Sequence, residues 1–170
     1  IENANELAIA EFDAMVEQLR THKIKVQVVQ DTKDPSTPDS IFPNNWFSTH
    51  AGGTLCLYPM YAKNRRAERK LSVIDFLQKN YKIENLLDLT DLEKEGKFIE
   101  GTGSMVLDHQ NKISYGCLSE RLDKEAFTYW CNKMQFKPIS FKALDHKAQS
   151  IYHTNVMMCM GNQFVVICLE

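Results

Sequence analysis

A recurring order of predicted elements constrains the fold of this chain more than any other feature. Two strand-like runs joined by a short turn predict a β-hairpin in three places, beginning near Trp46, Ser104 and Thr154. The first two hairpins are each followed by a stretch with helical spacing of apolar residues and then by another strand-like run. The hairpins start about 50 to 58 residues apart, which is the length of a supersecondary repeat. We therefore expect a mixed α/β fold built from ββαβ units.

The remaining elements follow from the same patterns. We expect helices over residues 4–20, 65–80 and 120–134, the last with Ser119 as its N-cap, and single strands over residues 23–29, 82–89 and 135–141. The first helix and strand resemble the end of an earlier unit, and the last hairpin resembles the start of a later one. The chain also starts at Ile1 rather than at a methionine, and it stops at Glu170 directly after an apolar strand. These features predict a fragment of a longer protein.

Composition and charge exclude several classes of protein. The 170 residues are enough for one domain with its own core. A net charge of −2 gives no electrostatic footprint for nucleic acid or an anionic membrane, and no apolar run approaches the roughly 20 residues of a membrane span. The five cysteines lack metal-binding spacing, and most lie in apolar runs. We therefore expect free thiols in a reducing cytoplasm, and neither a metal nor a cofactor.

Polar residues gather just before the first strand of each hairpin. They occupy residues 39–45, 100–103 and 153–155. If the units surround a common axis, these segments converge, and Asp39 and Glu100 meet His153 as a catalytic set. Simpler explanations exist, because turn glycines follow Glu100 and a lone histidine at the head of an apolar strand is more often a core residue. In the first segment we expect Phe42 and Trp46 to anchor the loop in the core.

Five motifs in a fixed order resemble those of the guanidine-modifying superfamily, the penteins: PDSIFPNNW, YPMYAKNRRAER, FIEGTGSMVLDH, SERLD and YHTNV. The superfamily includes arginine deiminase, dimethylarginine dimethylaminohydrolase and the amidinotransferases. The likeness is greatest to the bacterial amidinotransferase-like branch associated with citrulline hydrolysis. It implies a five-bladed α/β propeller of ββαβ units, of which about three are present. Residues 1–170 would then form one partial catalytic domain that lacks its N-terminal start and its C-terminal units.

The same resemblance implies a hydrolase that cleaves C–N bonds of a ureido or guanidino amino acid through a covalent cysteine intermediate. The family nucleophile lies near the C-terminus of the full protein, and none of the five cysteines here matches its motif. We therefore expect the chain to be inactive alone. His153 stands at the position of the histidine that acts as acid for the leaving amine and as base for water. Glu100 stands at the position of the glutamate that contacts substrate nitrogens and orients the site.

The substrate-binding residues that the resemblance implies are Asp39, Asn45 and Asn155 for the planar head group and Arg65 or Arg66, with Arg121, for the α-carboxylate. Arginine deiminases carry aspartates at the positions of Asn45 and Asn155. A carboxylate pairs with a cationic guanidinium, whereas an asparagine also offers a donor to the carbonyl oxygen of a neutral ureido group. The asparagines therefore favour citrulline over arginine.

Two alternatives stay open at this point. A true amidinotransferase would pass an amidino group to a second amine instead of to water, and nothing in these residues separates the two reactions. A noncatalytic propeller-like binding protein would share the fold without the chemistry. Against that second alternative, Asp39, Glu100 and His153 are all present with their flanking motifs. The expected partner is a small amino-acid substrate, not nucleic acid or a membrane, and a homo-oligomer is compatible with the sequence.

Overall fold

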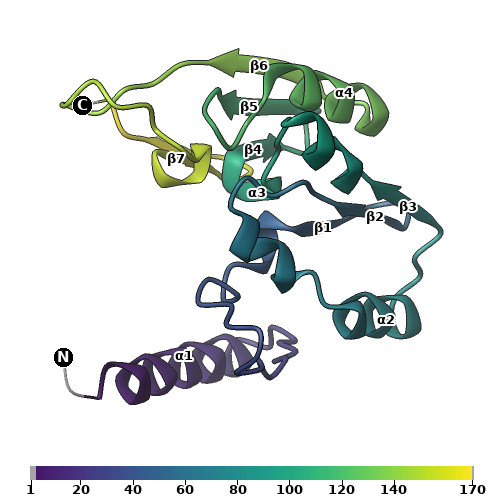
Figure 1. Ribbon diagram of the computed structural model, residues 1–170, viewed down its shortest axis with the longest axis vertical. Helices are drawn as coiled ribbons and strands as arrows, with labels where there is room; N and C mark the ends of the chain where they lie inside the picture. Colours follow the sequence, from purple (N-terminus) through teal and green to yellow (C-terminus); the bar gives the residue numbers. More distant parts are fainter. Residues whose placement is uncertain (1–2, 170) are drawn as a thin grey trace. The chain divides into compact units, whose positions relative to one another are not determined.

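A computed structural model describes residues 3–169, which form two compact units, residues 3–31 and residues 32–169. The first unit contains helix α1 (Ala4–Thr21), as the sequence predicts (Figure 1). Its C-terminus is closed by backbone bonds from the N–H groups of His22 and Lys23 to carbonyls of the last turn. The strand predicted over residues 23–29 is wrong. A strand needs a partner for its ladder, and no described strand forms a ladder with this segment.

The second unit begins with a three-stranded sheet. Strands β1 (Phe47–His50) and β2 (Thr54–Leu57) form an antiparallel hairpin, and β3 (Asn85–Asp88) lies parallel to β2. Between β2 and β3 the chain forms the 3₁₀-helix η2 (Lys63–Glu68) and helix α2 (Leu71–Asn80). The apolar side of α2 packs on a cluster that includes the buried Trp46, as expected, whereas Phe42 is 49% exposed and does not anchor the loop. The single helix predicted over residues 65–80 is therefore two elements.

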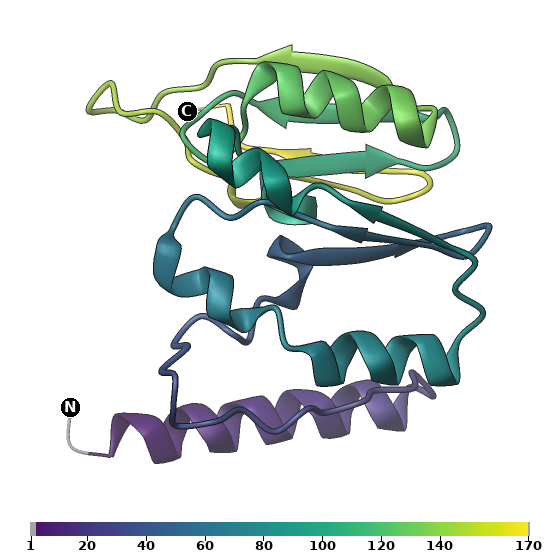
Figure 2. The same ribbon diagram turned by 45° about the vertical axis from the view of Figure 1, so that its right-hand side comes forward.

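A second sheet repeats this arrangement. Helix α3 (Gly101–Ser104) leads into β4 (Met105–Asp108), which pairs antiparallel with β5 (Ile113–Cys117), and β6 (Lys137–Phe141) lies parallel to β5. Helix α4 (Lys124–Met134) makes the crossover, and Figure 2 shows it lying across this sheet. Its buried face consists of Ala126, Phe127, Trp130 and Cys131. The short 3₁₀-helix η3 (Thr90–Glu95) links the two repeats.

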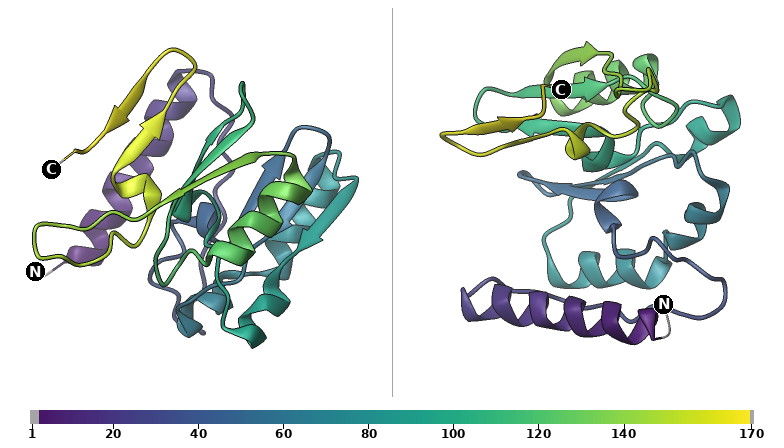
Figure 3. Two further views of the ribbon diagram at one scale, coloured as in Figure 1. Left: turned by 90° about the horizontal axis from the view of Figure 1, so that it is seen from above. Right: turned by 90° about the vertical axis from the view of Figure 1, so that its left-hand side faces the viewer.

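The third repeat consists of the 3₁₀-helix η4 (Thr154–Val156) and the hairpin of β7 (Met158–Met160) and β8 (Val165–Ile167). Strand β7 contacts β4, so the hairpin lies beside the second sheet (Figure 3). A short helical turn precedes the first strand of every hairpin, namely η1 (Pro43–Asn45), α3 and η4. The expected mixed α/β fold of ββαβ units is confirmed, two of them complete and one represented by its hairpin. Among the described residues no helix is long and apolar enough to cross a membrane.

Candidate active site

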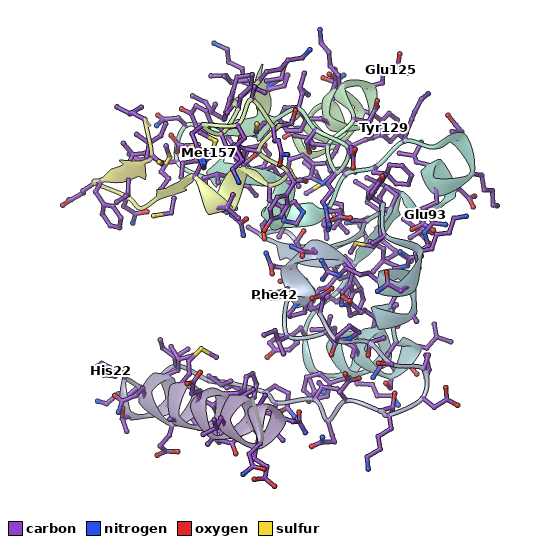
Figure 4. The ribbon with its side chains drawn as sticks, turned by 60° about the vertical axis from the view of Figure 1, so that its left-hand side comes forward. His22, Phe42, Glu93, Glu125, Tyr129 and Met157 are labelled. Atoms are coloured by element: carbon purple, nitrogen blue, oxygen red, sulfur yellow. The ribbon has the colours of Figure 1, made fainter. Side chains whose placement is uncertain are left out.

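The three helical turns η1, α3 and η4 meet, and two glycines of α3 allow them to do so. A Cβ atom at Gly103 would collide with Asn45 Nδ2 from η1 and would lie 3.0 Å from Cε1 of His153, which precedes η4. A Cβ atom at Gly101, which has φ +47°, would collide with the backbone oxygen of Asn44. Figure 4 labels Phe42 and Met157, which flank η1 and η4. The structure therefore brings together Asn45, the Glu100–Gly103 turn and His153, one part of each predicted polar segment. Asp39, the third member of the expected catalytic set, instead lies beside Arg65.

Glu100 lies at the centre of this convergence and is fully buried. Its Oε2 accepts hydrogen bonds from His153 Nε2 at 2.8 Å and from Arg121 Nη1 at 3.2 Å, and its Oε1 accepts from the backbone N–H of Tyr61 at 3.0 Å. Burial raises the pKa of Glu100, but the hydrogen bond from His153 and the charge of Arg121 lower it more, so the net pKa is below the ordinary value. Glu100 is thus ionised and held by three donors.

The tautomer of His153 follows from its partner. An ionised carboxylate only accepts hydrogen bonds, so the Nε2 atom that faces Glu100 must carry a hydrogen. This leaves Nδ1 on the side toward Gly103, where a Cβ atom would lie 3.1 Å from it. The neighbouring Thr154 fixes the histidine backbone, because its buried hydroxyl donates to the carbonyl of Ser104 and accepts from the N–H of Cys117.

Arg65 lies behind Asn45 and is itself buried, with a side chain only 5% exposed. Its Nε and Nη2 donate to the two carboxylate oxygens of Glu68 at 2.8 and 2.9 Å. Its Nη1 donates to Asn45 Oδ1 at 2.7 Å, and Nη2 also reaches the carbonyl of Asp39 at 3.3 Å. The contact with a substrate α-carboxylate that was expected of Arg65 does not fit this burial. Arg65 instead holds the side chain of Asn45. Sequence reasoning missed Glu68, although the spacing Arg-x-x-Glu on a helical turn is a usable signal.

The other predicted binding residues lie nearer the surface. Arg121 contacts Glu100 and stacks on the ring of Tyr152 at 5.2 Å, with its side chain 28% exposed. Arg66 pairs with Glu93 at 3.1 Å and donates to the carbonyl of Met60; Glu93 is labelled in Figure 4. The carboxylate of Asp39 is 48% exposed and lies 3.8 Å from Arg65 Nε, and Asn155 is exposed.

The arrangement is suited to proton transfer beside a planar polar group. A buried ionised carboxylate orients a histidine, while the second ring nitrogen stays available. The amide of Asn45 and the partly exposed guanidinium of Arg121 lie around the same pair. The ββαβ repeats and the contacts of Glu100 with His153 and Arg121 agree with the expected pentein superfamily.

A comparison with known protein families identifies the family within this superfamily. Residues 1–170 match the family model described as N,N dimethylarginine dimethylhydrolase, eukaryotic, and the chain belongs to this family. The expected superfamily is thereby confirmed, whereas its bacterial branch is not. No curated protein matches the chain.

Several solved structures are similar in fold to this chain. The N-terminal domain of ArgZ bound to substrate, an arginine dihydrolase from the ornithine–ammonia cycle in cyanobacteria, has a TM-score of 0.74 and 17% identity over 95% of this chain and 55% of that one. The complex of AgrE with ornithine and NAD⁺ has a TM-score of 0.75 and 18% identity, over 95% of this chain and 22% of that one. A dimethylarginine dimethylaminohydrolase adduct with 4-chloro-2-hydroxymethylpyridine has a TM-score of 0.70 and 15% identity, over 95% and 60%. The chain thus shares their fold and spans about half the length of the ArgZ domain.

Proposed function

We propose that this chain is part of a hydrolase that cleaves a C–N bond of a ureido or guanidino amino acid through a covalent cysteine intermediate. The observation that carries the proposal is the buried Glu100 carboxylate, which orients His153 at 2.8 Å within the meeting point of three repeats. An ion pair with a purely structural role would not require that Nδ1 of His153 lie beside Gly103, a residue without a side chain. Membership in the N,N dimethylarginine dimethylhydrolase family supports the same chemistry.

In the proposed reaction, a cysteine thiolate from a part of the protein outside residues 1–170 attacks the central carbon of the planar head group. The C–S bond forms, the C–N bond breaks, and the departing nitrogen takes a proton from His153. Neutral His153 then removes a proton from water, whose oxygen attacks the same carbon and breaks the C–S bond to regenerate the thiolate. Nδ1 is the nitrogen that transfers these protons, because Nε2 is bound to Glu100.

For the substrate we propose citrulline. Arg65 is only a donor, so Asn45 turns its oxygen to Arg65 and its amide N–H groups toward Gly103. An N–H donor suits the carbonyl oxygen of a ureido group and gives no favourable pairing to a guanidinium. We assign the head group to Asp39, Asn45 and Asn155, and the α-carboxylate to Arg121, which reaches the surface beside Glu100, with Arg66 as the second candidate.

Residues 1–170 are proposed to be one partial catalytic domain whose further units and nucleophile lie elsewhere in the protein. The test therefore uses the full-length protein. Citrulline, arginine and N,N-dimethylarginine are each incubated with it, and kcat/KM is measured together with the release of ammonia or amine. We expect citrulline to give the highest kcat/KM, and a much faster turnover of arginine would refute that preference.

Two further measurements decide the class of reaction. His153→Ala should abolish turnover while leaving the circular dichroism spectrum unchanged, and retained activity would refute the assigned role. Transfer of the head group to an added amine, instead of release to water, would identify an amidinotransferase. Binding without any turnover in the wild-type protein would identify a noncatalytic binding protein.

A further inference from the structure

Glu68 is a buried carboxylate that the proposed reaction does not use. Its side chain is 0% exposed, and both of its oxygens are bound by Arg65, at 2.8 and 2.9 Å. A buried ion pair of this kind is rarely the most stable solution for a site, because both charges lose their hydration. Its presence beside the candidate active site therefore calls for a reason other than stability.

The third contact of Arg65 supplies that reason. Its Nη1 donates to Asn45 Oδ1 at 2.7 Å, while the Nδ2 of the same amide lies against Gly103. An asparagine amide has nearly the same shape in both of its orientations, so its surroundings decide which end points where. Arg65 has no acceptor, and it therefore accepts only one orientation of Asn45. Glu68, in turn, fixes the plane of the guanidinium by binding it at two points.

We infer that Glu68 is a positioning residue for substrate selection: through Arg65 it holds Asn45 with its N–H groups toward the substrate head group. The part of the inference that concerns the substrate head group rests on the proposed function. The contacts from Glu68 through Arg65 to Asn45 do not depend on it. Without the Glu68 carboxylate, Arg65 is a buried, uncompensated cation that moves toward water or toward the nearby Asp39, 3.8 Å away. Asn45 is then free to turn its oxygen toward the substrate.

The first test measures kcat/KM for citrulline and for arginine in the full-length protein and its Glu68→Gln variant. We expect the citrulline value to fall about tenfold or more, since small displacements at a reacting centre cost on the order of 10²-fold. The arginine value should fall less, because a turned Asn45 offers its oxygen to a guanidinium. The ratio of the two values therefore shifts toward arginine. A purely structural role lowers both values by one factor, and an unchanged ratio would overturn the inference.

A double-variant cycle tests whether Glu68 acts through Asn45. In the Asn45→Ala background, Glu68→Gln should leave the citrulline-to-arginine ratio where Asn45→Ala alone puts it. Independent effects that multiply in the double variant would contradict the inference. The matched control is Asp123→Ala, which removes a helix cap far along the chain from these residues and should leave the ratio unchanged.

Two provisions keep the test decisive. If Glu68→Gln does not fold, Glu68→Asp takes its place. This variant keeps the charge, but its side chain is one methylene too short to keep both contacts with Arg65. It should shift the citrulline-to-arginine ratio in the same direction. If the wild-type protein hydrolyses neither substrate, the proposed function fails, and the position of Asn45 is read directly by NMR. The side-chain amide signals of Asn45 should move in Glu68→Gln and not in Asp123→Ala. Unmoved signals in Glu68→Gln would overturn the inference.

Discussion

At the scale of single residues, two glycines set how closely the repeats approach one another around Glu100. Gly103 lies between the amide of Asn45 and the ring of His153, and Gly101 lies against the backbone of Asn44. The sequence marks these positions only as a glycine pair after an acid. A surface turn would give the same pattern, so only the neighbours from other repeats distinguish a turn from a packed site.

Gly103→Ala should impair both catalysis and stability. The added methyl group collides with Asn45 and His153, so we expect kcat/KM of the full-length protein to fall at least about tenfold. Overpacking should also cost about 1–3 kcal/mol of the free energy of unfolding. Gly52→Ala is the control, because nothing lies within 4 Å of its Cβ position and only its φ of +85° resists the change. It should cost about 1–2 kcal/mol with full activity retained, and equal losses of activity in both variants would contradict the site.

Glu100 should make the stability of the protein depend on acid pH. Burial raises its pKa, but His153 and Arg121 lower it below the ordinary value of 4.5. A carboxylate with a lowered folded-state pKa contributes stability that is complete above the unfolded value and is lost as pH falls through the folded value. Urea unfolding between pH 6 and pH 3 should therefore show a steeper loss for the wild type than for Glu100→Gln. Identical slopes would show that Glu100 does not titrate in this way.

At the scale of elements, the sequence pattern predicts the hairpins and the crossover helices well, but it does not predict the residues at which the helices begin. Ser119 was expected to cap α4, but Asp123 does so, with its carboxylate accepting from the N–H groups of Glu125 and Ala126 at 2.9 Å. Ser119 instead donates to the carbonyl of Tyr152. Both residue types are good caps, so local preference could not choose between them. In the folded chain Ser119 is bound to the segment that precedes η4, and the helix begins after Asp123.

The cap of α4 gives a prediction that is independent of function. Asp123→Ala leaves two N–H groups of the first turn without their acceptor and should lower the free energy of unfolding by about 1 kcal/mol, within a range of 0.5–2. Asp123→Asn keeps an acceptor and should lose much less. Chemical denaturation of the two variants checks this, and a Ser119→Ala loss without any Asp123→Ala loss would restore the original assignment.

At the scale of the whole molecule, the first two repeats share one core. Cys56 and Tyr58 from the first repeat pack with Met105, Phe127 and Trp130 from the second. This shared packing fixes the two sheets relative to each other, and it is the reason that η1 and α3 can present their polar residues to one place. No described strand forms a ladder with residues 23–29, which explains why their alternating pattern did not produce a strand.

The cysteines allow a test of where the nucleophile lies. Burial raises the pKa values of Cys56, Cys117 and Cys131, the last to about 11, so these thiols are poor nucleophiles near neutral pH. A thiol-reactive substrate analogue should therefore label a cysteine outside residues 1–170, as located by peptide mass spectrometry of the full-length protein. Cys159→Ser and Cys168→Ser, at the two exposed positions, should retain activity. Labelling within residues 1–170 that parallels inactivation would refute the proposed mechanism.

The sequence by itself determined the repeat, the hairpins, the segments that carry the polar residues and the superfamily, because periodicity and motif order are local properties of the chain. Only the tertiary structure decided which of those polar residues are buried partners. It joined Glu100 to His153 across 53 positions of sequence and placed Arg65 behind Asn45 rather than at the surface. It also revealed Glu68. A carboxylate that serves a site through an intermediate arginine looks, in sequence, like any charged residue on a helical turn, and only burial and distance distinguish the two.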